Sequence, residues 1–344
     1  MRPFIHGFRA ATYCPNGYMA VLDESVRASA GGATGRVNDA SHDEPAAYTA
    51  AAASPQDVPR SGRSPASLWS RLRSRLSLTG LAGFVILVFW IVIAVIGPWI
   101  EPYHGGAFSS TETFGSYSAA HWLGTDYIGR DMLSRLLEGT RYTLGLALLA
   151  TLAASLSGTA LGVLAALSSR WVEEPMSRVF DALISIPSKV FALVMIAAFG
   201  SSISLLILVA ALAYIPGAYR IARSLAVNLM TLEYVQVARA RGEGLFYIAR
   251  VEILPNMIHP MLADFGLRFV FIVLLLSGLS FLGLGVQPPN ADWGSLVREN
   301  IGGLAMGVPA VLMPAVAIAT LTIGVNLLID NLRRRNPGLR GGGR

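Results

Sequence analysis

Residues 231–256 read TLEYVQVARARGEGLFYIARVEILPN and lie between two long hydrophobic blocks of the chain. Thr231 is a suitable N-cap for a short helix that runs to about Arg241. Gly242 and Gly244 follow directly and predict a break in that helix. Because both flanking blocks are apolar enough to cross a membrane, this polar stretch must leave the bilayer and then return to it.

A second short helix is predicted over 245–254, and Pro255 is predicted to end it. Small side chains surround the glycine break, so another surface could approach the chain closely at that point. Short loops rich in arginine stay on the cytosolic side of a membrane, which predicts a cytosolic loop over 220–260. The arginines of this loop are Arg220, Arg223, Arg239, Arg241 and Arg250.

The same stretch resembles the cytosolic coupling motif of ABC importer permeases, in which a small-residue run, a glycine and an Ile-x-Leu-Pro-like end have fixed spacing. Two places depart from that motif: Gln236 stands where a glutamate is usual, and Ile253-Leu254-Pro255 lacks the intervening residue. An amphipathic helix that merely lies on the membrane is the alternative interpretation. The resemblance implies a contact with an ATPase partner through Gln236, Ala238, Arg239, Ala240, Gly242, Gly244 and Pro255.

Composition independently indicates a membrane protein. The chain has 344 residues, of which 53% are hydrophobic and only 14% charged, whereas soluble domains carry nearer a quarter charged residues. The net charge of +6 would suggest a nucleic-acid partner in a soluble protein. Here the arginines flank apolar segments, so we expect bilayer orientation to explain them and no nucleic acid to bind. A single cysteine, Cys14, excludes an intramolecular disulfide, and we expect neither a metal site nor a cofactor in this chain.

We predict an all-α fold with six transmembrane helices, over 81–100, 142–167, 180–199, 205–219, 261–284 and 308–328. Residues 1–67 and 338–344 are expected to be cytosolic tails, the first disordered and without a secretory signal. Met19 could be the true start. An interfacial basic segment against anionic lipid and the first span occupy 68–100. An extracytoplasmic loop occupies 101–141 and a five-helix core 142–337, which leaves both termini in the cytosol.

Two outer segments narrow the resemblance to one branch of the family. Residues 121–135 contain LGTDYIGRD, and residues 283–294 read GLGVQPPNADWG. Both resemble the C-type permease subunit of dipeptide, oligopeptide and nickel importers, whose outer side meets a solute-binding protein. The candidate docking residues are therefore Asp126, Arg130, Asp131 and Asp292. For the first segment we favour a self-contained charged cap in which Asp126, Arg130, Asp131 and Arg135 pair locally.

Residues inside the predicted spans and one in the last outer loop are candidates for a translocation path or gate. Lys189 either faces such a path or pairs within the helix bundle. Pro216 predicts a kink near a cytosolic gate, and Trp293 is either a gate residue or a packing residue of the last outer loop. Asp181 either snorkels to the cytosolic end of its span or pairs with Arg178, and Asp264 can pair with Arg268, four residues further along the same helix.

The second span carries Gly158 and Gly162, whose spacing predicts close packing against another helix. Residues 170–178 are expected to form a short turn on the cytosolic side before the third span.

The sequence has no Gly-x-x-x-x-Gly-Lys-[Ser/Thr] phosphate loop, so it cannot hydrolyse ATP by that route. The resemblance, which covers about 70–337, implies a permease of the inner membrane. Its partners would be a second, similar permease, two ATP-binding subunits or domains that hold ATP and Mg, and an external solute-binding protein. The implied substrates are di- and oligopeptides, with nickel, glutathione or another small solute as alternatives.

Two alternatives to a permease belong to other functional classes: an ATP-independent secondary transporter or channel, and a membrane enzyme. Ion coupling needs ionisable groups near the bilayer midplane, and Lys189 is the one candidate. No nucleophile–base set stands out in the sequence, so no catalytic residue is expected and the enzyme ranks last.

Overall fold

The computed structural model describes residues 78–103, 106–308, 310 and 312–334, all within one compact unit, Arg63–Arg344. Regular secondary structure in these ranges is helical, and β pairing is limited to two isolated bridges in the loop before residue 132. The predicted all-α fold is therefore confirmed. The two predicted tails, 1–67 and 338–344, and the basic segment before the first span lie outside the described residues.

In the described part of the chain, five helices are long and apolar enough to cross a membrane. A sixth crossing results if a bent helix pair counts as one span. The five helices are α2 (Leu78–Ile100), α3 (Met132–Leu167), α6 (Ile203–Met230), α9 (Leu254–Phe281) and α11 (Leu312–Arg334). The bent pair is α4 (Arg170–Ser185) and α5 (Ser188–Phe199), whose axes differ by 86°.

The bent pair corrects the predicted third span. We expected a turn over 170–178 followed by one straight helix, but α4 is already helical from Arg170. The helix stops at Ile186, whose backbone is extended (φ −86°, ψ 122°), and α5 starts after Pro187. Proline disfavours helical geometry in the residue before it and donates no backbone hydrogen bond, which accounts for the break.

Two other prolines lie within helices, and the prediction that Pro255 ends a short helix is wrong. α6 passes through Pro216 without interruption and continues to Met230. Pro255 lies in the first turn of α9 rather than at the end of a short helix. An N–H in the first turn of a helix has no partner within that helix, so proline is tolerated there. The predicted spans therefore marked the apolar parts of these helices and missed the polar turns that extend them.

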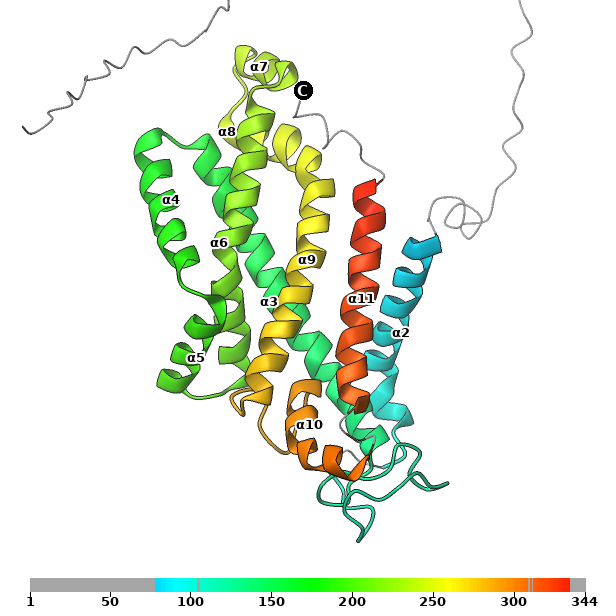
Figure 1. Cartoon of the computed structure of the whole chain (residues 1–344). Coiled ribbons are helices and arrows are strands. Elements are labelled where there is room, and N and C mark those ends of the chain that lie inside the picture. Colours follow the sequence, from blue (N-terminus) through cyan, green and yellow to red (C-terminus); the bar gives the residue numbers. More distant parts are fainter. Residues whose placement is uncertain (1–77, 104–105, 309, 311, 335–344) are drawn as a thin grey trace, which may run out of the picture. The chain divides into compact units, whose positions relative to one another are not determined.

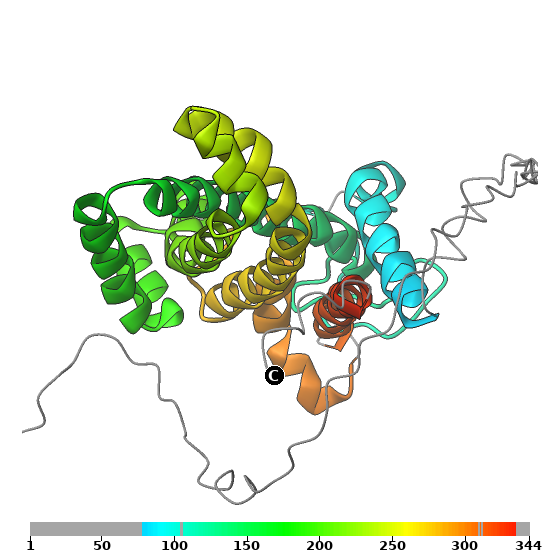
Figure 2. The same cartoon turned by 90° about the horizontal axis from the view of Figure 1, so that it is seen from above.

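The helices pack as a bundle in which α3 lies along α6, α2 lies beside α11, and α9 contacts α3, α6 and α11 (Figures 1 and 2). The contact between α3 and α6 depends on Gly158 and Gly162. A Cβ atom on Gly162 would lie 2.7 Å from the carbonyl oxygen of Tyr219 and 2.8 Å from the Cβ of Ala222. The predicted close packing at these two glycines is confirmed.

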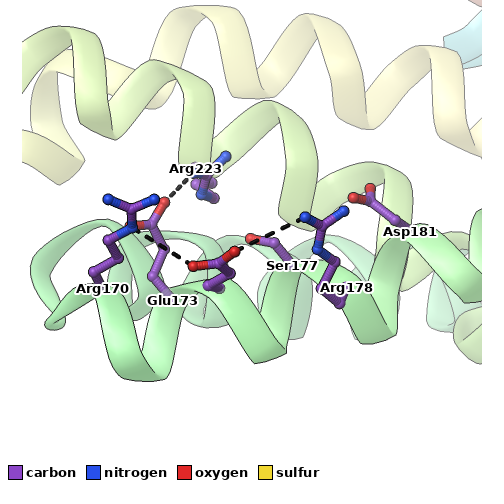
Figure 3. A pocket seen from close by; sticks show the side chains of 7 residues that line it. Arg170, Glu173, Ser177, Arg178, Asp181 and Arg223 are labelled. Carbon is purple, nitrogen blue, oxygen red and sulfur yellow. Dashed lines mark hydrogen bonds and ion pairs between the residues drawn. The ribbon is translucent and has the colours of Figure 1, made fainter.

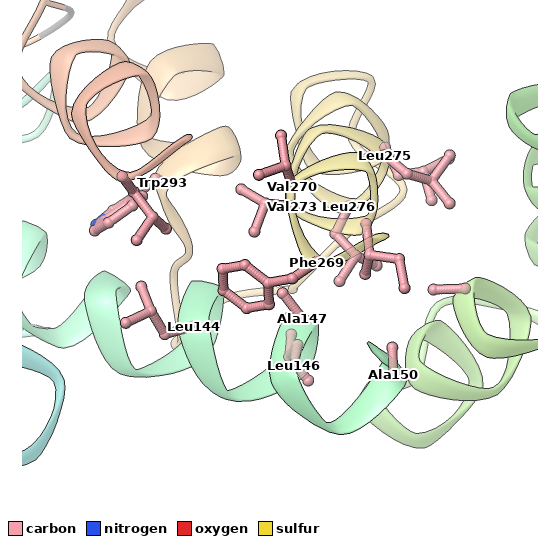
Figure 4. Packing of buried hydrophobic residues seen from close by; sticks show 14 of the residues in the cluster. Leu144, Leu146, Ala147, Ala150, Phe269, Val270, Val273, Leu275, Leu276 and Trp293 are labelled. Carbon is pink, nitrogen blue, oxygen red and sulfur yellow. The ribbon is translucent and has the colours of Figure 1, made fainter. Parts of the chain in front are cut away.

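The main hydrophobic core lies between α9, α3 and the short helix α10 (Trp293–Glu299). Phe269 and Val273 of α9 face Leu144 and Ala147 of α3, and Trp293 closes this cluster at one end (Figure 4). Trp90 of α2 reaches the same core, where its ring meets that of Trp293 edge-on at 4.7 Å between centroids. The Trp90 indole N–H also donates to Thr320 of α11 (3.2 Å).

Short elements occupy the two ends of the bundle. At one end lie α7 (Glu233–Ala240), α8 (Leu245–Tyr247) and a π-helix, η1 (Ile248–Ile253). At the other lie α10, the 3₁₀ helix η2 (Ile301–Met306) and the loop that precedes α3. We call these the α7 end and the α10 end; Figure 1 shows them at the top and bottom of the bundle.

Packing at Gly162 can be tested against Gly145, which lies in the same helix with no other atom within 4 Å of an added Cβ. We expect Gly162→Ala to lower the free energy of unfolding by about 1–3 kcal/mol, because the methyl group meets the backbone of α6. Gly145→Ala should be neutral or stabilising by up to about 1 kcal/mol, since alanine favours the helix. Thermal unfolding of both variants in detergent measures the difference, and equal melting temperatures would contradict this account of the α3–α6 contact.

Candidate functional site

The segment at the α7 end differs in detail from its prediction. Thr231 closes α6 and its hydroxyl donates backwards to the carbonyl of Asn228 (2.8 Å), so it does not cap α7. Leu232 occupies the N-cap position of α7 instead. The predicted α7 itself is confirmed, ending at Ala240.

The glycine break is confirmed, and its geometry assigns the two glycines different roles. Gly242 has φ +83°, the left-handed region that favours glycine, whereas Gly244 has φ −71°, which any residue adopts. The Gly242 N–H donates to the carbonyl of Arg239 (2.9 Å), and the Glu243 N–H donates to that of Ala238 (3.2 Å). This pair of bonds is a Schellman motif, which requires the left-handed residue to stand at position 242.

Gln236 supplies a contact that a glutamate could not make. Its side-chain Nε2 donates to the carbonyl of Met230 at the end of α6 (2.8 Å). Arg239 lies almost one turn further along the same face of α7, and its guanidinium donates to the sulfur of Met230 (3.3 Å). An ionised carboxylate has no proton to donate, so the glutamine at this position fastens α7 to the C-terminus of α6.

Apolar side chains anchor the segment to the bundle. A second hydrophobic cluster contains Val235, Ile248, Ile253 and Met257, packed on α3 and α6 through small residues such as Ala222. Each of these four larger side chains is buried. Burying side chains of this size stabilises by about 1.5–3 kcal/mol each, so the segment moves with α6 and α9 as one body.

The exposed side of the segment carries most of the predicted coupling residues. Ala238 is an exception, because it is buried within the chain. Large apolar side chains stand beside the others, including Val237, Leu245 and the largely exposed Phe246 (77%). The predicted coupling residues that are exposed are Gln236, Arg239, Ala240, Gly242, Gly244 and Pro255.

A π-helix joins this segment to α9. In η1, the Leu254 N–H donates to the carbonyl of Ala249, five residues back. Pro255 is the next residue and has no N–H to donate. The wider π-turn therefore lies where an ordinary helical hydrogen bond is lost in any case. π-turns are rare and are frequent at functional sites.

A buried network of charges organises the α10 end. Asp126 accepts from Arg130 Nε (2.8 Å) and from Arg135 Nη1 (2.9 Å). Glu299 of α10 accepts from the same two arginines, at 3.3 and 2.8 Å. The predicted local pairing is confirmed for Asp126, Arg130 and Arg135. Asp131 does not join this network. It caps α3 by accepting a hydrogen bond from the Ser134 N–H (2.8 Å), and it contacts His121.

Burial raises the pKa of the Glu299 carboxyl; the nearby Arg130 opposes that rise and the nearby Asp126 adds to it. Asp292 is also buried, and its burial raises the pKa of the Asp292 carboxyl. Hydrogen bonds from Ser280 and from the Ser295 side chain and backbone act against that increase. Asp292 caps α10 in a capping box with Ser295.

The candidate docking residues Asp126, Arg130, Asp131 and Asp292 are therefore buried within the chain. Their structural effect is to hold the outer loop and α10 in shape, while other side chains form the surface. Trp122 (71% exposed) is one of those outer side chains. Direct docking through the four charged side chains stays a prediction, and in this conformation they offer little surface for it.

The three path or gate candidates lie in different surroundings. Lys189 is exposed in the first turn of α5, just after the bend. Trp293 is fully buried, where its backbone N–H donates to Thr143 (3.0 Å). Pro216 is buried in α6 and lines a hollow between α4 and α6. The pair of Asp264 and Arg268 is confirmed at 2.6 Å, and Arg268 also donates to the carbonyl of Tyr214 (2.7 Å).

Ion pairs join α4 to α6 beside that hollow and beside a second hollow that adjoins it, whose lining Figure 3 shows. Glu173 pairs with Arg223, and Asp181 pairs with Arg220 at 2.7 Å. The expected pair of Asp181 with Arg178 is wrong: Arg178 pairs with Glu174 on its own helix (3.8 Å). Half-exposed pairs of this kind contribute about 0–1 kcal/mol, so they can open and close at little cost.

Sequence reasoning missed Glu299 and the α4–α6 pairs. Glu299 is far from Arg135 in the chain, so no local sequence spacing predicts their contact. A signal did exist for α4, because Glu173, Ser177 and Asp181 recur every four residues and so share one helical face. Within the described ranges, no group of three or more His, Cys, Asp and Glu side chains is placed to share a metal ion.

Comparison with known proteins identifies the family to which this architecture belongs. Residues 158–336 match the family model described as binding-protein-dependent transport system inner membrane component. The chain belongs to this family. It is thus a permease with the fold of type I ABC importers, and the predicted role as a membrane component without enzymatic activity of its own is confirmed.

Individual relatives match most of this permease. A dipeptide transport system permease protein, DppC, from Alkalihalophilus pseudofirmus is 30% identical over 78% of this chain and 88% of its own length. A glutathione transport system permease protein, GsiD, from Pectobacterium atrosepticum is 32% identical over 77% of this chain and 88% of its own. Both alignments extend well beyond the 158–336 family match.

Removing the carboxylate at the centre of the buried network should destabilise the permease strongly. We expect Asp126→Asn to lower the free energy of unfolding by about 3–5 kcal/mol, because Arg130 and Arg135 then share one buried carboxylate, Glu299. Glu174→Gln, which removes an exposed partner of Arg170 and Arg178, should change it by about 0.5 kcal/mol or less. Thermal unfolding in detergent compares the two variants; a small effect of Asp126→Asn would refute the scaffold role.

Asp292 should make stability depend on pH. A carboxyl whose pKa is raised by folding stabilises most below its ordinary pKa of about 3.9, and its contribution falls as pH rises. Asp292→Asn keeps an oxygen that can cap α10 but cannot ionise. The melting temperature of this variant relative to wild type should therefore increase from acid to neutral pH.

Asp292→Ala provides the comparison for the cap itself. It should be destabilised at every pH, by about 0.5–2 kcal/mol, because the cap is lost. A pH-independent gap between wild type and Asp292→Asn would show that burial does not govern this carboxyl.

Proposed function

We propose that this permease forms half of the translocation path of an ATP-driven importer of di- and oligopeptides, with its α7 end in the cytosol. Arginines are more numerous at that end than at the α10 end, where Arg130 and Arg135 are held in ion pairs. The positive-inside rule therefore supports a position outside the cytosol for residues 101–131, α10 and η2, and a position inside it for both termini.

The exposed face of α7 to η1 is the observation that carries this proposal. It combines basic side chains with apolar ones such as Phe246 on a segment whose other side is buried in the bundle. Exposed apolar patches on a rigid support are typical of protein–protein contacts. A groove on an ATP-binding partner would take this face, and Ala238 would support the contact from beneath.

Motion of the partner would pass directly into the transmembrane helices. α7 follows α6 after a two-residue connection, and η1 continues into α9 without a loop. Because α6 and α9 are both attached to the segment through buried side chains, displacement of the segment tilts both helices together. Such rocking of helices gives alternating access to a site within the membrane.

The remaining partners follow from the same assembly. A second, similar permease would complete the path, two ATP-binding subunits would hold ATP and Mg, and an external solute-binding protein would dock at the α10 end. We propose that the loop held by Asp126, Arg130, Asp131 and Asp292 shapes this docking surface, with exposed side chains such as Trp122 making the contacts.

Peptide transport is favoured by the relative that bears the name of a dipeptide permease. Glutathione is the second candidate substrate, favoured by the relative named for glutathione transport. Both are short peptides with charged ends. Nickel or another small solute remains the alternative within this importer class, and an ATP-independent transporter is the alternative outside it.

Purification of the tagged chain in mild detergent tests the proposal. A second permease and ATP-binding subunits should co-purify, and ATP hydrolysis by the complex should rise when the solute-binding protein and a dipeptide are added. A lone chain that moves solute without ATP would overturn the proposal and make Lys189 the first residue to mutate, as Lys189→Met.

One glycine of the break and one glycine of α3 allow a matched test of coupling. Gly242→Ala puts a side chain at φ +83°, which costs about 1–2 kcal/mol, although no neighbouring atom blocks the added methyl group. We expect transport to fall severalfold while the protein remains in the membrane. Gly145→Ala, in α3 and away from the segment, meets neither strain nor contacts and should transport normally. Equal uptake by the two variants, measured in vesicles with ATP, would remove the coupling role assigned to Gly242.

A further inference from the structure

α4 turns its polar face toward the bundle. Glu173, Ser177 and Asp181 face α6, where the Ser177 hydroxyl lies 2.8 Å from that of Tyr219. Phe180 also packs its ring on that of Tyr219 (4.3 Å between centroids), whereas other apolar side chains such as Trp171 (91% exposed) point away. No residue of α4 is buried in the described chain. A helix that packs for stability buries its apolar face, so this orientation indicates that the space between α4 and α6 is meant to hold water or a polar solute.

That space contains two adjoining hollows of about 330 and 410 Å³. They share Ser177, Asp181 and Arg223 in their walls. Volumes in this range suit small-molecule sites. The gate candidate Pro216 lines the larger hollow, and α5 with Lys189 begins just beyond the end of α4.

Charges of both signs line the two hollows, which together we call the α4–α6 crevice. The carboxylates are Glu173, Glu174 and Asp181, and the guanidinium groups are those of Arg170, Arg178, Arg220 and Arg223. Elsewhere in the described bundle the ion pairs between different elements are buried ones, those of Glu299 with Arg130 and Arg135. The crevice thus differs from the scaffold network in being open and in being able to exchange partners.

From these observations we infer that the α4–α6 crevice binds the charged ends of a short peptide on the cytosolic side of the path, a site that rests on the proposed function. The carboxylates receive the peptide's ammonium group, and the guanidinium groups receive its carboxylate. The peptide replaces the Asp181–Arg220 pair with two pairs of its own and leaves the Glu173–Arg223 pair in place, so no charge is left without a partner. Weak, exchangeable contacts of this kind let a solute enter and also leave.

Thiol protection tests the site in the assembled transporter. The chain has one cysteine, so Cys14→Ser provides a cysteine-free background. Ser224→Cys places a thiol in the wall of the larger hollow, and Ser169→Cys places a control thiol at the N-cap of α4, outside either hollow. A charged, membrane-impermeant methanethiosulfonate is applied to inside-out vesicles that contain the whole complex, with dialanine or with N-acetyl-dialanine amide.

Dialanine at about twice its dissociation constant should slow the reaction at Ser224→Cys about threefold, because about a third of the sites are then free. The blocked peptide, which has no charged ends, should not slow it, and the control thiol should react at one rate throughout. Adding Asp181→Asn and Arg220→Gln to Ser224→Cys should abolish protection by dialanine.

Equal reaction rates with and without dialanine, in inside-out vesicles that release enclosed dipeptide when ATP is added, would overturn the crevice site and leave the importer standing. Equal protection by the blocked peptide would overturn recognition of charged ends. Inside-out vesicles that neither release enclosed dipeptide with ATP nor show protection would overturn the site together with the proposed function.

Discussion

The close contact of α3 with α6 is the constraint on which the other features depend. Gly158 and Gly162 let the two backbones approach so closely that a methyl group at either glycine would meet α6. α3 begins within the buried charge network of the α10 end, and α6 leads into α7 and forms one wall of the charged crevice. A shift at this contact would therefore change both ends of the bundle together.

Charge serves opposite purposes at those two ends. Asp126, Arg130, Arg135 and Glu299 are buried and share their partners, so removing one carboxylate leaves the arginines poorly compensated. The pairs between α4 and α6 are open to solvent, and each contributes little. The first arrangement fixes a shape, whereas the second leaves groups free to exchange partners, which is what handling a charged solute requires.

Proline and glycine determine where the helices bend and where they continue. Pro187 separates α4 from α5, yet Pro216 stays within α6 and Pro255 lies in the first turn of α9. Position accounts for Pro255, because an N–H in the first turn has no partner within the helix, whereas α6 accommodates Pro216 without a break. Gly242 is different, since its left-handed backbone is what ends α7 and turns the chain toward η1.

The sequence by itself determined the helical membrane fold, the glycine break after α7, the close packing of Gly158 and Gly162, and the local pairs Asp126–Arg130 and Asp264–Arg268. All of these depend on composition or on residues a few positions apart, which sequence spacing reports directly. Only the tertiary structure decided that Asp181 meets Arg220, that Glu299 completes the buried network, that Trp293 is a core residue, and that α4 faces α6 with its polar side. These contacts join residues distant in the chain, so packing of whole helices, and not local spacing, selects them.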